Sequence, residues 1–354
     1  MATTTITSSV TTTTRASIQI ITNEMTYYGP IIILVIGIIG CLCNFITFTA
    51  PQLRKNSCAF YFLMSAVFEL LSITFGLISR LAADHLGSTL INTNQVYCKS
   101  RVYLVSVLPL IATYLVLLSS IDRFLSSSVS VRLRSFSQIK IAYHATIGAI
   151  VIGFLSCIHI LIGYDLRPRC GILVGTFATF DSMFVVFWLG VIPHVLMLIF
   201  GFLTIMNIQR TKKRVAVKPS QNVVTLTQQQ RRQQRTDAQL IVMMLFQVGF
   251  STLLVLTRMI YYAYYVLAPP LTGYDKLIGS FLMSFTTLVY YANYAKSFYI
   301  YTLSSQLFRS VFFHRMEFFL RKILGQYATV ICKDKAVHNV ETSATNRTQH
   351  PTKY

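Results

Sequence analysis

Seven stretches of apolar residues constrain the fold of this chain more than any other feature. An α-helix needs roughly 20 apolar residues to cross the hydrocarbon core of a bilayer, and none of the seven stretches is interrupted by a run of charges. The sequence therefore predicts an all-α membrane protein, a bundle of seven transmembrane helices. The stretches run over residues 28–50, 58–83, 102–124, 139–163, 177–208, 240–267 and 277–302.

The overall composition agrees with a membrane location. Hydrophobic residues make up 54% of the chain and charged residues 12%, whereas a soluble protein carries about 25% charged residues. A net charge of +20 would suit nucleic-acid binding in a soluble protein. In a multi-span chain, basic residues instead set the orientation of the spans and contact anionic lipid and acidic protein surfaces. We therefore expect membrane lipid, and no nucleic acid, among the partners.

The distribution of Lys and Arg between the connections predicts the orientation. Basic residues concentrate in the first, third and fifth connections and after the last stretch, whereas the other connections mix acidic and basic residues. Cytoplasmic loops are the ones enriched in Lys and Arg. The N-terminus should therefore lie outside and the C-terminus in the cytoplasm, in a multi-pass protein of the plasma membrane.

The segments outside the spans complete the expected domain organisation. Residues 1–27 are Thr/Ser-rich and of low complexity, which predicts a disordered extracellular N-terminus. Residues 28–303 form one seven-transmembrane domain, because most of their connections are short. Residues 304–323 interleave apolar with basic side chains, which predicts an amphipathic helix on the inner membrane surface. Residues 324–354 form a cytoplasmic tail.

The seven cysteines divide by predicted location. Four fall in or near apolar stretches, where free thiols pack as small hydrophobes, and Cys332 lies in the tail. Only Cys98 and Cys170 fall on the face predicted to be oxidising, where disulfides persist. We predict that these two form a disulfide; the alternative is two unpaired thiols at helix ends.

Six short motifs, in order along the chain, carry a family resemblance. They are Gly40-Cys41-Leu42-Cys43-Asn44, Ser65-Ala66-Val67-Phe68-Glu69, Asp122-Arg123-Phe124, Pro193, Ser297-Phe298-Tyr299-Ile300-Tyr301 and Ser305-Gln306-Leu307-Phe308-Arg309. Their order and spacing resemble the rhodopsin-like (class A) G-protein-coupled receptors over roughly residues 28–323. The resemblance implies a receptor for an extracellular ligand that activates a heterotrimeric G protein, with arrestin as a further partner and no cofactor.

The chain also departs from the family pattern. Trp188, its one tryptophan, lies outside the fourth stretch, the sixth stretch has no proline, and Phe298 stands where the seventh helix has proline. Because proline kinks a helix, the family's usual hinges in helices six and seven are missing. Among subfamilies, the divergent invertebrate peptide receptors of the FMRFamide type look closest, which implies a neuropeptide ligand.

The resemblance assigns G-protein coupling to Asp122, Arg123, Phe124 and Tyr301. In the family, the arginine is held by its neighbouring acid when inactive and meets the G protein when active, and the tyrosine moves toward it. An Asp-Arg pair at the rim of an apolar stretch is costly unless it meets water or a partner. The alternatives are a helix-end ion pair without a signalling role, and simple aromatic packing for Tyr301.

Glu69 is a lone carboxylate in the middle of the second apolar stretch, and such residues are functional candidates. The resemblance implies a sodium or proton pocket formed by Glu69, Asn44 and Asn293. Ala112 stands where the family has a serine, which removes one oxygen ligand. The alternative is a protonated Glu69 that is hydrogen-bonded to polar groups of the seventh helix.

The expected ligand is a peptide. Val105 stands where amine receptors carry an aspartate, and Tyr291 where opsins carry the retinal-binding lysine. The candidate contacts combine charged and aromatic side chains, which suits a peptide carrying Arg-like and Phe-like side chains. These candidates are Arg101, Arg169, Asp181, Arg258, Tyr261 and Tyr262.

A transporter or channel without G-protein coupling is the alternative class. Transporters show internal repeats and paired broken helices, which this sequence lacks. A conducting path needs several polar positions, and only Glu69 and Lys296 qualify. We expect no enzymatic activity, because the histidines show no metal-ligand spacing and no Gly-X-Ser-X-Gly elbow occurs. The isolated histidines are His144, His159 and His194.

Overall fold

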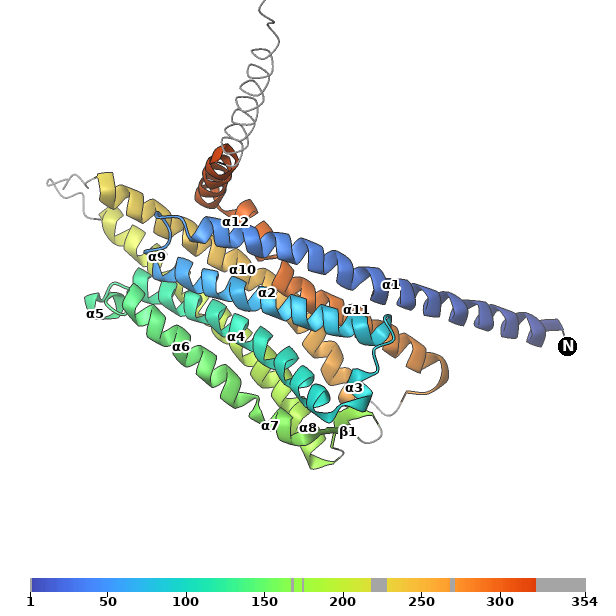
Figure 1. The fold of residues 1–354 in the computed structure, drawn as a ribbon. Helices are drawn as coiled ribbons and strands as arrows, with labels where there is room; N and C mark the ends of the chain where they lie inside the picture. The colour runs from blue at the N-terminus through green and yellow to red at the C-terminus, as the bar shows by residue number, and fades with distance from the viewer. Residues whose placement is uncertain (1, 167–168, 174, 218–227, 268–270, 323–354) are drawn as a thin grey trace, which may run out of the picture.

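The computed structural model describes residues 2–166, 169–173, 175–217, 228–267 and 271–322; the side chains of 2–14, 212–217, 228–234 and 267 are not described. The long helices run side by side as one bundle (Figure 1). The elements are α1 (Ala2–Phe48), α2 (Ser57–Asp84), α3 (Leu90–Thr93), α4 (Gln95–Ser127), α5 (Val131–Arg134), α6 (Ile139–Ser156), α7 (Ile158–Gly163), β1 (Tyr164–Leu166), β2 (Cys170–Ile172), α8 (Thr176–Met183), the π-helical η1 (Phe184–Val191), α9 (Ile192–Val217), α10 (Gln228–Leu267), α11 (Gly273–Ala295) and α12 (Ser297–Ser304).

Six helical segments of the described chain are long and apolar enough to cross a membrane, and they coincide with the first six predicted stretches. They are Arg15–Phe48, Ser57–Asp84, Gln95–Ser127, Ile139–Gly163, Thr176–Thr211 and Arg235–Val266. The seventh stretch is helical but is divided into α11 and α12 at Lys296. Polar residues such as Ser284, Thr286 and Asn293 dilute its apolar character. The structure is therefore a helical bundle with six candidate membrane spans.

The N-terminal segment differs from the sequence-based prediction. Residues 1–27 were expected to be disordered, but α1 begins at Ala2, and its first half extends beyond the bundle (Figure 1). Extending an existing helix gains one hydrogen bond per residue without a new nucleation cost. Thr hydroxyls also find acceptors within the helix: Thr22 Oγ1 donates to the Ile18 carbonyl at 2.7 Å, and Thr26 Oγ1 to the Thr22 carbonyl at 2.9 Å.

The two ends of the bundle differ in character. At the hairpin end, β1 and β2 pair antiparallel with Leu166 opposite Cys170, close to the start of α4. The predicted disulfide is confirmed: Cys98 bonds Cys170, with their Cα atoms 5.7 Å apart. The opposite end carries α5 and the facing ends of α9 and α10 (Figure 1). We call it the basic end, because it holds Arg54, Lys55, Arg132, Arg134, Lys140, Arg210 and Arg235.

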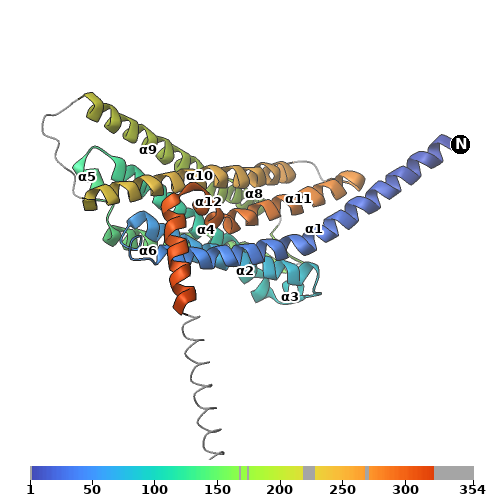
Figure 2. The same cartoon turned by 90° about the horizontal axis from the view of Figure 1, so that it is seen from above.

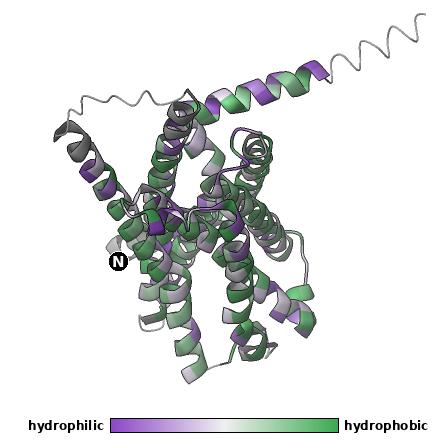
Figure 3. Cartoon of the chain, turned by 90° about the vertical axis from the view of Figure 1, so that its left-hand side faces the viewer, coloured by the Kyte–Doolittle hydropathy of each residue, from purple (hydrophilic) through white to green (hydrophobic). Residues whose placement is uncertain are grey.

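Two hydrophobic clusters fill the interior. One, toward the hairpin end, includes Leu77, Val107 and Ile111; the other, toward the basic end, is built around Phe62 and Tyr301. Many large apolar side chains instead point outward, and hydrophobic residues make up most of the length of the bundle helices (Figure 3). A soluble monomer rarely exposes so much contiguous apolar area, and a bilayer would cover it.

Residues 306–322 are helical and leave the bundle across the direction of its long helices (Figure 2). Phe308 and Val311 are buried against the bundle, whereas Phe313, Phe318 and Phe319 are exposed. This agrees with the helix predicted for residues 304–323. The predicted tail, residues 324–354 with Cys332, lies outside the described residues.

Candidate functional site

Asp122 and Arg123 lie at the basic end, in the last two turns of α4, and both are buried, with 4% and 2% exposure. The Asp122 carboxylate accepts hydrogen bonds from the Ser57 hydroxyl at 2.6 Å and the Ser137 hydroxyl at 2.8 Å. Arg123 Nε donates to the other Asp122 oxygen at 3.1 Å, and Nη2 donates to the same oxygen. Both Asp122 oxygens are thus satisfied, as a buried charge requires.

Arg123 also reaches α10. Its Nη1 lies 3.1 Å from Asp237 Oδ1, and its Nη2 donates to Asn56 Oδ1 at 3.3 Å. Asn56 Nδ2 donates in turn to Asp237 at 3.0 Å, and Asn56 Oδ1 caps α2 by accepting from the Cys58 amide at 3.0 Å. One guanidinium therefore links α4, the start of α2 and α10.

The sequence did not lead us to predict Asp237 as a site residue. Its position could have indicated a role, because it is the lone acid near Arg231, Arg232 and Arg235, just before the sixth apolar stretch. In the Arg123–Asp237 ion pair, the Arg123 side chain is 2% exposed and the Asp237 side chain is 37% exposed. A half-exposed pair of this kind contributes about 1 kcal/mol or less, so it can open at a modest free-energy cost.

The other two residues assigned to coupling do not contact Arg123. The Phe124 ring packs on Phe200, with centroids 5.6 Å apart. Tyr301 is buried in an aromatic cluster with Phe48, Phe62 and Phe308. Its hydroxyl has no hydrogen-bond partner within the described part of the chain. In this state Tyr301 is a packing residue, and movement toward Arg123 would require it to leave this cluster.

Glu69 lies deeper in the bundle and is 2% exposed. Its Oε1 accepts from the Ser297 hydroxyl at 2.8 Å and from the Ser65 hydroxyl at 3.1 Å. Gln247 Nε2 on α10 donates to Ser297 at 3.3 Å. Oε2 has no hydrogen-bond partner among the described residues. Glu69 and Asn293 both line a small cavity of about 10 Å³, close to the minimum for one water molecule.

Lys296 supplies a positive charge beside this cavity. Its Nζ donates to Asn293 Oδ1 at 2.8 Å, to Ser251 Oγ at 2.9 Å and to the Asn293 carbonyl at 3.0 Å. A side chain inserted into the i→i−4 hydrogen-bond ladder interrupts a helix, and α11 ends just before Lys296. The seventh stretch thus has a break without the proline that the family uses.

Of the three residues predicted for a sodium or proton pocket, Asn44 stands apart. Both polar atoms of its side chain are buried without a hydrogen-bond partner in the described chain, and it does not line the cavity. Lys296 bonds Asn293, which lines the same cavity as Glu69. The chain therefore places one of its own basic groups near the Glu69 carboxylate, and we expect the two to attract each other.

A double-mutant cycle of Glu69→Gln and Lys296→Met should reveal this attraction. Removing one member of a buried charge pair costs more than removing both, so the double variant should lose less stability than the sum of the two single losses. We expect an interaction energy of about 0.5–3 kcal/mol, measured from thermal unfolding in detergent. Lys140→Met, at the start of α6, is the control and should be additive with Glu69→Gln. Additivity of Glu69→Gln with Lys296→Met would contradict the pairing.

The structure separates the six candidate ligand contacts. Asp181 is 2% exposed, because it bonds His159 Nε2 at 3.2 Å and the Tyr164 hydroxyl at 3.2 Å. These two partners hold Asp181 in the interior, and its role as a ligand contact stays a prediction. The Tyr261 hydroxyl donates to the Gly279 carbonyl at 3.0 Å, which ties α10 to α11. Arg169 is exposed between the two strands.

Arg101, Arg258 and Tyr262 remain as interior candidates at the hairpin end. Arg101 Nε donates to the Ser79 hydroxyl at 3.1 Å. The Arg258 guanidinium lies over the Tyr262 ring, 5.3 Å from its centroid, a cation–π geometry.

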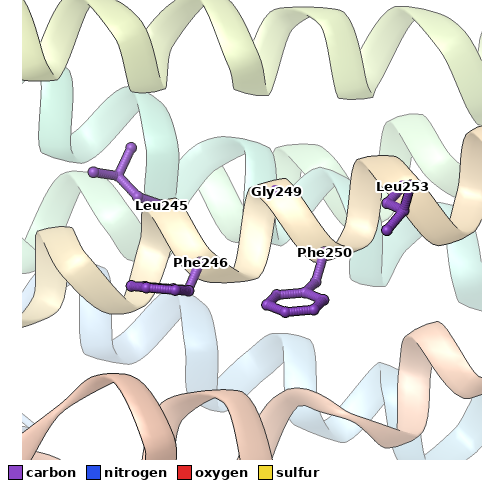
Figure 4. Close-up of a pocket in the computed structure, with 5 residues that line it drawn as sticks. All are labelled: Leu245, Phe246, Gly249, Phe250 and Leu253. Carbon is purple, nitrogen blue, oxygen red and sulfur yellow. The ribbon is translucent and has the colours of Figure 1, made fainter.

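Two larger hollows are lined almost entirely by apolar atoms. One, of about 370 Å³ on α10, is lined by Leu245, Phe246, Gly249, Phe250 and Leu253 (Figure 4). The other, of about 480 Å³, lies among α4, α6 and the η1–α9 region, with Tyr114 and Trp188 in its wall. Neither offers a group for catalysis or for recognition of a charged ligand.

Comparisons with known proteins return no relative: no protein-family model matches the chain, and no characterised protein has a similar sequence. Among the described residues, no group of three or more His, Cys, Asp or Glu side chains could hold a metal ion. The functional argument therefore depends on the chain's own geometry.

Proposed function

We propose that this chain is a seven-helix receptor of the plasma membrane that binds an extracellular ligand and activates a heterotrimeric G protein. The observation that best supports this proposal is the buried Arg123, which is held between Asp122 on its own helix and Asp237 on α10. An interior arginine that links two long helices through a breakable ion pair gives the basic end two arrangements, closed and open.

The proposal takes α11 and α12 together as the seventh span. α11 runs alongside α1, α2 and α10 (Figures 1 and 2), and α12 continues it toward the basic end. Ser284, Thr286 and Asn293 are buried, so these polar groups face protein and not lipid. Seven spans put the two chain ends on opposite sides, with the basic end in the cytoplasm as its Lys and Arg content favours.

Activation then follows as a population shift. A ligand bound at the hairpin end favours the arrangement for which it has higher affinity. If that arrangement moves the start of α10 away from α4, the Arg123–Asp237 pair breaks and Arg123 becomes available to a cytoplasmic partner. The side-chain break at Lys296 and the π-helical η1 supply irregular points in the bundle where such movement can occur.

Asp237→Asn should raise basal guanine-nucleotide exchange without any ligand. The substitution keeps the hydrogen-bonding shape but removes the charge that holds Arg123 to α10. Loss of an ion pair worth up to about 1 kcal/mol should increase the open population about two- to fivefold. The measurement is nucleotide exchange in membranes that contain the receptor and a representative of each Gα class.

Asp275→Asn is the matched control, because it removes an acid from the first turn of α11, at the opposite end of the bundle. It should leave basal exchange unchanged. If Asp237→Asn reaches the cell surface and every Gα class still shows the exchange rate of receptor-free membranes, G-protein coupling is the wrong function. A transporter or channel would be the remaining class.

A further inference from the structure

Three arginines from three different helices converge at the hairpin end of the bundle. They are Arg80 on α2, Arg101 on α4 and Arg258 on α10. Arg101 bonds Ser79, the residue next to Arg80, and Arg80 and Arg258 bond Ser284 and Thr286, two residues apart on α11. All three side chains are partly buried. The sequence analysis singled out Arg101 and Arg258 but not Arg80.

The hydrogen bonds of these guanidinium groups go largely to neutral partners. Arg101 Nε donates to Ser79. Arg258 Nη1 donates to the Thr286 hydroxyl at 3.2 Å and contacts the Met283 sulfur. Arg80 Nη2 donates to the Ser284 hydroxyl at 3.3 Å. Each guanidinium has five N–H donors, so most donors of the cluster have no acceptor among these contacts.

The nearby acids do not balance the cluster. Asp84 pairs with Arg80 Nε at 3.2 Å, and its own side chain is 42% exposed. Asp181 is held by His159 and Tyr164. Across the described residues, no carboxylate forms an ion pair with Arg101 or Arg258. The cluster therefore carries three positive charges against one partly solvated acid.

Such an arrangement costs stability in the empty protein. Partly buried charges with too few counter-charges lose part of their hydration, and like charges add repulsion. Residues that oppose stability in this way are characteristic of binding sites. An oxyanion would relieve both costs, because the planar guanidinium donates two parallel hydrogen bonds to a carboxylate or a phosphate.

We infer that the Arg80–Arg101–Arg258 cluster is the recognition site for an oxyanion, a carboxylate or a phosphate, carried by the extracellular ligand. The statement that the ligand comes from outside the cell rests on the proposed function. The inference differs from the expectation of a peptide carrying Arg-like and Phe-like side chains, because this cluster would repel the cationic groups of such a peptide. The Tyr262 ring, which lies against the Arg258 guanidinium, favours an anion attached to an aromatic or other apolar group.

The test measures thermal unfolding of the purified full-length chain in detergent, followed with a thiol-reactive dye. The free cysteines Cys41, Cys58 and Cys157 are buried, so the dye reports unfolding. The probes are benzoate, for a carboxylate, and phenyl phosphate, for a phosphate. Benzamide is the neutral counterpart, and sodium chloride keeps ionic strength equal. At saturation we expect benzoate or phenyl phosphate to raise the Tm by about 2–4 °C and benzamide not to raise it.

The triple variant Arg80→Gln/Arg101→Gln/Arg258→Gln should lose this shift. The matched control Arg132→Gln/Arg134→Gln/Lys140→Gln, which removes three charges at the basic end, should keep it. Should the first triple variant fail to fold, Arg258→Lys serves instead: it keeps the charge, loses the planar fork and should reduce the shift at least threefold.

A ligand-free measurement adds a second criterion. Arg258→Gln without any probe should unfold at the wild-type Tm or above it, because the substitution relieves repulsion from Arg80. A clear fall in Tm would mean that Arg258 is structural. Equal shifts with the anions and with benzamide, or the same anion shift in the triple variant, would overturn the inference.

These readouts contain no G protein, so they separate the two proposals. If the chain binds oxyanions at the cluster but never promotes nucleotide exchange, this inference is supported and the proposed function is contradicted. If the chain shows normal basal exchange and no response to the anions, only the proposed function is supported. Whichever of benzoate and phenyl phosphate gives the larger shift identifies the preferred anion.

Discussion

Under the proposed function, Arg123→Ala should abolish guanine-nucleotide exchange while leaving the protein folded and on the cell surface. The side chain carries a charge that links α4, α2 and α10 at the basic end, and under the proposed function it is the group presented to the G protein. Exchange should fall to the level of receptor-free membranes, in the presence or absence of a ligand.

The fold should survive this substitution because the two acids keep other partners. Asp122 retains the Ser57 and Ser137 hydroxyls, and Asp237 is 37% exposed, so water can solvate it. We expect a stability loss of about 3 kcal/mol, the lower end of the range for breaking a buried ion pair. Surface labelling and thermal unfolding measure the two quantities separately.

Two further variants distinguish the roles of Arg123. Arg123→Ala/Asp237→Asn should be as inactive as Arg123→Ala, because opening the basic end is useless without the group that couples. Arg132→Ala, which removes an exposed arginine at the same end, should keep exchange. Full activity in surface-expressed Arg123→Ala would show that coupling depends on other residues.

Removing the disulfide should cause a loss of stability similar in size to that of Arg123→Ala. The Cys98–Cys170 bond closes a loop with a sequence separation of 72, and cross-linking a loop of this size stabilises by about 4 kcal/mol in the chain-entropy model. Segments that stay helical in the membrane when tertiary contacts are lost reduce that entropy, so we expect about 2–4 kcal/mol. The variant is Cys98→Ser/Cys170→Ser, assayed by thermal unfolding.

The double cysteine variant should also become insensitive to reductant, whereas the wild-type Tm should fall when dithiothreitol is added. Cys43→Ser, which changes a free thiol, is the control and should respond to reductant like the wild type. Mass spectrometry of unreduced protein gives an independent check. Two free thiols at Cys98 and Cys170 would contradict the bond.

The sequence by itself determined six long apolar helices, their order and the pairing of Cys98 with Cys170. Apolar length is a local property: about 20 consecutive apolar residues specify a spanning helix wherever they occur, and six such helices lie where the pattern placed them. The adjacency of Asp122 and Arg123 was equally visible. Local composition misjudged residues 1–27, because helix extension from an apolar segment depends on cooperativity and not on composition.

The tertiary structure alone decided which side chains meet. The separation of Arg123 and Asp237 is 114 residues, and three helices bring Arg80, Arg101 and Arg258 to neighbouring hydrogen-bond partners at the hairpin end. The rotation of each helix about its axis sets such contacts, and packing against all neighbours fixes that rotation. The same packing turned Asp181 inward to His159 and Tyr164, and left Asn44 apart from the cavity where Glu69 and Asn293 meet. A sequence pattern specifies which face of a helix is polar, but only the assembled bundle specifies the group that faces it.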